Sequence, residues 1–63
     1  METIIKTISK NASSVDIVYD DITYDCTCKL FVDGHRILAE DYIADDKQDA
    51  IVTAYQMLDK NLN

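Results

Sequence analysis

The side chains in this sequence that are most suited to a chemical role are carboxylates, which occur close together in one segment. The stretch AEDYIADDKQD, Ala39 to Asp49, carries five carboxylates and one lysine. Crowded carboxylates attract a cation, which is either a metal ion or the Lys and Arg side chains of another protein. A calcium loop needs oxygen ligands at a D-x-D-x-D-G spacing, which the sequence lacks. We therefore predict no metal site and expect the carboxylates to meet basic side chains of a partner.

The two cysteines and the single histidine are the other residues that could act in catalysis or bind a metal. Cys26 and Cys28 form a C-x-C pair on a predicted strand, where both side chains face the core. Only His35 remains to join them, which is too few ligands for zinc, so buried structural thiols are the expected role. His35 has no Ser or Cys nucleophile in a recognisable setting, and a single glycine excludes a Gly-rich phosphate loop. We predict no catalytic residue, no cofactor and no enzyme.

The charge balance restricts the classes of partner. Twelve acidic and six basic residues give a net charge of −6, which disfavours direct binding to nucleic acid or to an anionic membrane surface. It favours a basic partner, such as a protein that itself binds nucleic acid. The alternative is that the acidity only keeps the protein soluble.

Length and patterning predict one domain over residues 1–63. The N-terminus has no signal-peptide layout and no apolar run approaches the ~20 residues that span a bilayer, so we expect a cytoplasmic protein. In Met1–Lys10 the apolar residues recur at helical spacing, although the Ile and Thr content also suits a strand. A short strand follows from Val15, and the clearest alternation runs through Tyr24–Val32.

A hairpin and a helix complete the predicted fold. Asp33-Gly34 is typical of a type I′ turn, which places Val32 opposite His35. Counting along the third strand then pairs Leu30 with Ile37, Cys28 with Ala39, and Cys26 with Asp41. Asp45, with Gln48 three residues later, matches a capping box. The predicted helix stripe is Ile51, Ala54, Tyr55, Leu58 and Leu62. The predicted core sets this stripe against Tyr24, Cys26, Cys28, Leu30 and Ile37.

The predicted class is α+β: a short N-terminal helix, a three-stranded antiparallel meander and a C-terminal helix. In such a meander the carboxylates of three segments converge at one edge, and Ile22 and Tyr42 are apolar anchors among them. The predicted partner-binding residues are Asp20, Asp21, Ile22, Asp25, Glu40, Asp41, Tyr42, Asp45, Asp46 and Asp49. Helix-dipole stabilisation accounts only for the last three carboxylates. Val18, Phe31 and Leu38 are expected on the outer sheet face, where they could support a homodimer.

Two families resemble this pattern. The element order, the acidity, the VDG hairpin and the run AEDYIADDKQDAIVTAYQML resemble the small acidic anti-CRISPR proteins of phages, in particular those that block type II effector nucleases by imitating DNA. The run from CTCKLFVDGHR into the helix also resembles the strand-strand-helix part of a double-stranded RNA-binding domain. There a basic patch at the helix start grips phosphate, whereas the similar positions here are Asp45, Asp46, Lys47 and Asp49.

The sequence therefore predicts a non-enzymatic, phage-encoded inhibitor that acts in the cytoplasm of a bacterial host. Its acidic surface would occupy a nucleic-acid-binding groove of a CRISPR-type effector nuclease or a similar basic protein. The alternative is a small dimeric structural or regulatory module with a merely solubilising acidic face.

Overall fold

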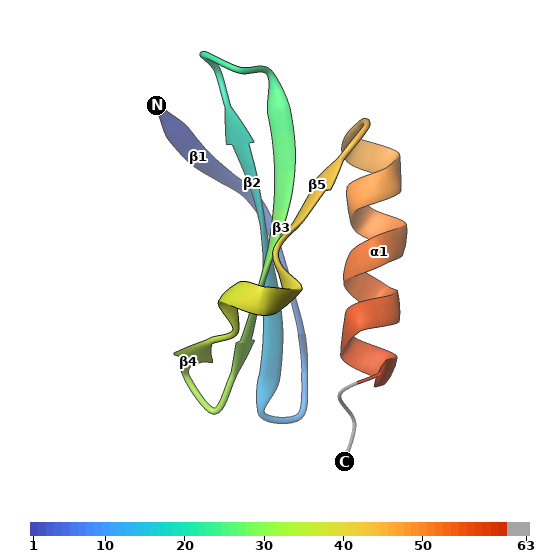
Figure 1. Ribbon diagram of the computed structural model, residues 1–63. Helices are drawn as coiled ribbons and strands as arrows, with labels where there is room; N and C mark the ends of the chain where they lie inside the picture. Colours follow the sequence, from blue (N-terminus) through green and yellow to red (C-terminus); the bar gives the residue numbers. More distant parts are fainter. Residues whose placement is uncertain (61–63) are drawn as a thin grey trace.

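A computed structural model shows one antiparallel sheet with a helix packed on one face, and it describes residues 1–60 (Figure 1). The elements are β1 (Glu2–Lys10), β2 (Ser13–Asp20), β3 (Asp25–Val32), β4 (His35–Arg36), the 3-10 turn η1 (Leu38–Glu40), β5 (Tyr42–Ala44) and α1 (Lys47–Lys60). The strands lie in the order β1-β2-β3-β4, and β5 also pairs with β3. No helix in residues 1–60 is long and apolar enough to cross a membrane.

The N-terminal segment is a strand, so the predicted N-terminal helix is wrong. β1 pairs with β2 along its whole length through a tight hairpin, in which Asn11 has a positive φ of 56°. The β-branched Ile and Thr residues favour this pairing, whereas an isolated helix of this length is marginal in water. A bulge between Ile4 and Lys6 interrupts the strand alternation and leaves apolar residues at helical spacing.

The predicted three-stranded meander is also wrong, because the sheet has five strands and its last part is interrupted. Val32 pairs with His35 as predicted, and Asp33 and Gly34 adopt the positive φ angles of 52° and 81° that the turn requires. The three residues of η1 then leave the sheet. Beyond them Cys28 pairs with Tyr42 instead of Ala39. The element order is therefore β-β-β-β-β-α. The three residues of η1 displace the pairing with β3 by three positions from the predicted register.

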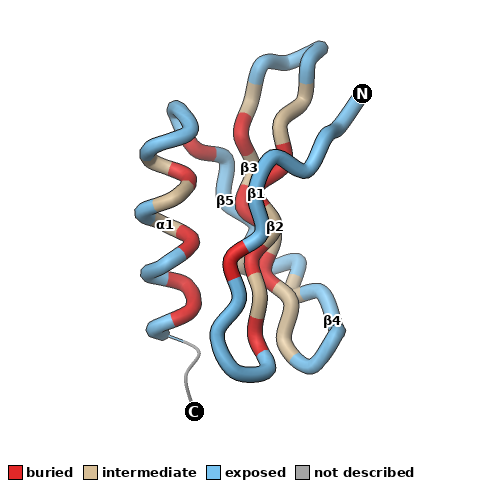
Figure 2. Tube along the Cα trace, turned by 180° about the vertical axis from the view of Figure 1, so that it is seen from behind, coloured by how far each residue is buried: buried red, intermediate tan, exposed pale blue. Residues whose placement is uncertain are grey.

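The core lies between α1 and the inner sheet face (Figure 2). Its largest fully buried side chains are Ile17, Leu30, Leu58, Val15 and Cys28.

The buried face of α1 is rotated from the predicted one. Its buried residues are Ala50, Ala54, Met57 and Leu58. Of the remaining predicted core residues, Ile51 and Ile37 are half-buried and Tyr24 and Tyr55 are exposed, while Leu62 lies outside the described residues. Alanines at the interface allow a close approach, in which the Cys28 thiol donates to the carbonyl of Ala50 at 3.2 Å. Burial, with a smaller effect of Asp49, raises the pKa of Cys28 to about 11.

Candidate functional site

Carboxylates from two connections gather at one end of the sheet. Asp20 and Asp25 face each other across β2 and β3. Cys26 pairs with Ala44, so the next residue, Asp45, follows on beside Asp25. The β2–β3 turn and the β5–α1 connection consequently lie at the same end of the molecule (Figure 1). We call this group the acidic end: Asp20, Asp21, Asp25, Asp45, Asp46 and Asp49.

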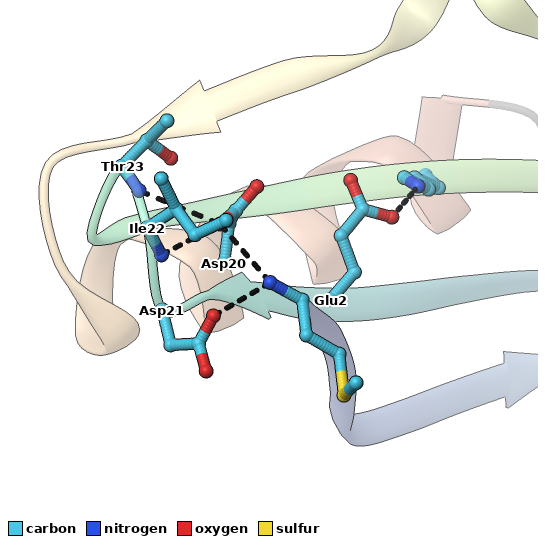
Figure 3. A network of polar contacts seen from close by, with 7 residues as sticks. Glu2, Asp20, Asp21, Ile22 and Thr23 are labelled. Atoms are coloured by element: carbon cyan, nitrogen blue, oxygen red, sulfur yellow. Dashed lines mark hydrogen bonds and ion pairs between the residues drawn. The ribbon is translucent and has the colours of Figure 1, made fainter.

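The β2–β3 turn is organised by Asp20 (Figure 3). Its Oδ1 accepts hydrogen bonds from the backbone N–H groups of Ile22 at 2.8 Å and Thr23 at 3.4 Å. The bond from Ile22 holds the pKa of the Asp20 carboxyl below its ordinary value. The amino group of Met1 lies 2.6 Å from Asp21 and 3.9 Å from Asp20. Asp20 thus remains ionised while it shapes the turn.

The same turn exposes two apolar side chains beside the carboxylates. Ile22 and Tyr24 are each 76% exposed, and Tyr24 has a positive φ of 62°. We predicted Ile22 as an anchor at the acidic end but placed Tyr24 in the core. Tyr24 was misplaced because the alternation of β3 extends to it in sequence, whereas the left-handed turn removes it from the strand.

The start of α1 uses its carboxylates for capping. The Asp46 carboxylate accepts from the backbone N–H of Asp49 at 2.8 Å, and the Asp49 carboxylate accepts from the backbone N–H of Asp45 at 3.2 Å. The cap is therefore Asp46 with Asp49, one residue later than the predicted Asp45 with Gln48. Asp49 also accepts from the Tyr42 hydroxyl at 2.8 Å, and this bond raises the pKa of Tyr42.

Two of the predicted carboxylates lie elsewhere. Glu40 is 3.7 Å from the ammonium of Lys60, at the far end of α1, and Asp41 is bonded to Arg36 of β4. Both residues lie away from the acidic end because η1 interrupts the segment between β4 and β5, which the sequence predicts as one continuous edge strand (Figure 1). Tyr42 reaches the acidic end only through its hydroxyl.

Cations compensate the carboxylates unevenly. Within residues 1–60, Glu2 pairs with Lys29 at 2.9 Å and Asp59 with Lys10 at 3.2 Å, in addition to the two pairs of Glu40 and Asp41. No ion pair among the described residues involves Asp25, Asp45, Asp46 or Asp49. Lys47 stands in the same region and likewise forms no ion pair within residues 1–60.

Other arrangements in the described part of the chain suggest no chemistry. Residues 1–60 contain no group of three His, Cys, Asp or Glu side chains arranged to hold a metal ion. An open groove of about 310 Å³ lies between η1 and α1, with Tyr42, Met57 and the Glu40–Lys60 pair among its lining residues. His35 is exposed in β4, away from both cysteines, which are buried.

Comparison with known proteins gives no match: no protein-family model, no curated protein and no solved structure is significantly similar to this chain.

Proposed function

We propose that this protein is a non-enzymatic inhibitor whose acidic end occupies the nucleic-acid-binding groove of a basic protein. The observation that supports this proposal best is that four of the six carboxylates without an ion pair within residues 1–60 gather at the acidic end: Asp25, Asp45, Asp46 and Asp49. Helix capping accounts for Asp46 and Asp49. It does not account for Asp25 and Asp45, whose side chains form no hydrogen bond or ion pair within residues 1–60.

A nucleic-acid-binding groove provides what these carboxylates lack. Its Arg and Lys side chains are arranged to bind phosphates. Arg binds carboxylates through the same bidentate hydrogen bonds that it forms with phosphates. A charge-assisted hydrogen bond contributes about 1.5–3 kcal/mol when it is well formed. The net charge of −6 would also speed the encounter with a basic surface.

The resemblance to DNA-imitating anti-CRISPR proteins supplies the first partner to test, a type II effector nuclease loaded with its guide RNA. Acidity and the carboxylates at the helix start support this choice. The N-terminal helix that the resemblance implies is a strand in this chain. An inhibitor of this kind acts in the cytoplasm of a bacterial host.

A second candidate, the homodimeric module, is favoured by a different observation. The sheet face opposite α1 exposes Ile4 and Ile43. Sedimentation equilibrium at micromolar concentration tests this second candidate, because the module requires a stable dimer.

The proposal is tested with a double variant, Asp25→Asn with Asp45→Asn. These side chains form no hydrogen bond within residues 1–60, so the variant should keep the fold. We expect its affinity for the nuclease to fall at least tenfold and the effect of added salt on binding to decrease. The matched control is Asp33→Asn with Asp59→Asn, since it removes two charges outside the acidic end. Equal affinities for the double variant and the control would overturn the proposal.

A further inference from the structure

The sheet face opposite α1 has no cover from any element within residues 1–60. α1 packs on the inner face, where the core lies (Figures 1 and 2). An antiparallel sheet commonly leaves its second face to water, so exposed aliphatic side chains on that face indicate a contact surface. The side chains of this open face therefore show which kind of layer it can accept.

An apolar row crosses the open face from one sheet edge to the other. Ile4 pairs with Val18, Val18 with Thr27, and Thr27 with Ile43, so the row spans β1, β2, β3 and β5. Val18 is only 6% exposed although it stands outside the core cluster. Ile4 and Ile43, at the two ends, are 59% and 65% exposed. We call these four residues, three aliphatic side chains and Thr27 with its methyl group, the apolar row.

An acidic row runs parallel to the apolar row. It consists of Glu2, Asp20, Asp25 and Asp45, each two positions away from a member of the apolar row in the same segment. Two residues of a strand span about 7 Å, so the two rows lie side by side. Glu2 is neutralised by Lys29, whereas Asp25 and Asp45 are uncompensated within residues 1–60. The acidic end therefore continues onto the open face, with aliphatic side chains beside it.

We propose that the open sheet face docks a basic amphipathic helix of the partner protein, which lies across the strands. The apolar stripe of that helix packs on the apolar row, and Arg or Lys side chains on its flank meet the acidic row. Four strands are separated by three intervals of about 4.8 Å, or about 14 Å in all. This span equals about ten residues of α-helix at ~1.5 Å each, which is roughly three turns.

Charge disfavours a second copy of this chain as the occupant. Within residues 1–60 the open face carries the carboxylates of Glu2, Asp16, Asp20, Asp25 and Asp45 against the ammonium groups of Lys29 and of the N-terminus, besides the Arg36–Asp41 pair. Two such faces stacked together would place like charges in a desolvated layer. A basic helix reverses the sign of that interaction. This inference rests on the proposed function, because it specifies that the basic partner presents an amphipathic helix to this protein.

The test uses a labelled synthetic peptide of about 14 residues as the probe, with Leu at helical spacing and Arg on the flanking stripe. A peptide of the same composition with the periodicity scrambled is its control. We expect the amphipathic peptide to bind at least tenfold more tightly in fluorescence anisotropy and to gain helicity in circular dichroism. Ile43→Ser should weaken its binding about tenfold. Leu38→Ser, which removes an equally exposed side chain outside the apolar row, should not.

Three results would overturn the inference. One is equal binding of the two peptides, or no binding of either. Another is an Ile43→Ser variant that binds like the parent chain. The third is a chain that is itself dimeric and becomes monomeric on Ile43→Ser, which would assign the face to a second copy. If the nuclease binds and the double variant with Asp25→Asn and Asp45→Asn weakens it, the proposed function stands even where the peptide result fails.

Discussion

Replacing Asp25 by Asn should stabilise the fold while it weakens the function. Asp25 stands directly opposite Asp20 in the β2–β3 ladder, and a backbone hydrogen bond keeps Asp20 ionised. Like charges in directly opposite positions destabilise a sheet, and cross-strand pairs of this kind are worth about 0.2–1 kcal/mol. Asn removes the charge with little change in shape and leaves the turn bonds of Asp20 intact.

The expected gain is measurable in so small a protein. For a domain of this size 1 kcal/mol shifts Tm by about 4–8 °C, so Asp25→Asn should raise Tm by about 1–8 °C. Thermal unfolding followed by circular dichroism measures this shift. At low ionic strength the gain should be largest, and in ~1 M salt, where the Debye length is about 3 Å, it should vanish.

A control separates this local repulsion from the general effect of net charge. Asp59→Asn changes the net charge by the same amount but breaks the exposed ion pair with Lys10, so it should lower stability by at most about 1 kcal/mol. Opposite signs for the two variants support the reasoning. A lower Tm for Asp25→Asn, or a gain that persists in high salt, would refute it.

Three further predictions concern the core, the helix cap and the alkaline limit of stability. Leu30 is fully buried, so Leu30→Ala should cost about 2–5 kcal/mol in urea unfolding, and a loss under ~1 kcal/mol would show that the described core is wrong. Asp46→Ala removes the cap of α1 and should cost about 0.5–2 kcal/mol, whereas Asp46→Asn should retain most of the stability; equal losses would exclude a capping role. The folded-state pKa values of Cys28, about 11, and of Tyr42 are raised above their unfolded values. The folded state favours the neutral forms of both groups, so the stability that they contribute is complete at neutral pH and is lost as the pH rises toward 11. The urea midpoint should therefore fall over that range, and a constant midpoint would contradict this.

Local signals in the sequence predicted part of the fold. The alternation of β3 and the Asp33-Gly34 turn depend on residues that are adjacent in the chain, and both are confirmed. The bulge near Ile5 and the η1 turn are different, because each depends on how distant segments fit together. Each changes the strand register, which no period-2 pattern indicates. The helix is also confirmed, but its face is rotated, since close packing selected Ala50 over the larger Ile51.

The candidate site was predictable to the same extent. Asp20, Asp25 and Asp45 come together because they flank connections at one end of the sheet, which the meander already implied. Glu40 and Asp41 do not join them, because η1 turns the chain away. The apolar row was missed apart from Val18, since recognising it requires the register on both sides of the bulge and of η1.

The most direct test of the central claim is whether this protein and target DNA exclude each other on one nuclease. A guide-loaded type II effector nuclease would be titrated with labelled target duplex at several fixed concentrations of the protein, in buffers of two ionic strengths. The account predicts competitive displacement: more duplex restores DNA binding completely, and displacement weakens in high salt. A ternary complex of nuclease, duplex and this protein at saturating concentrations would contradict it.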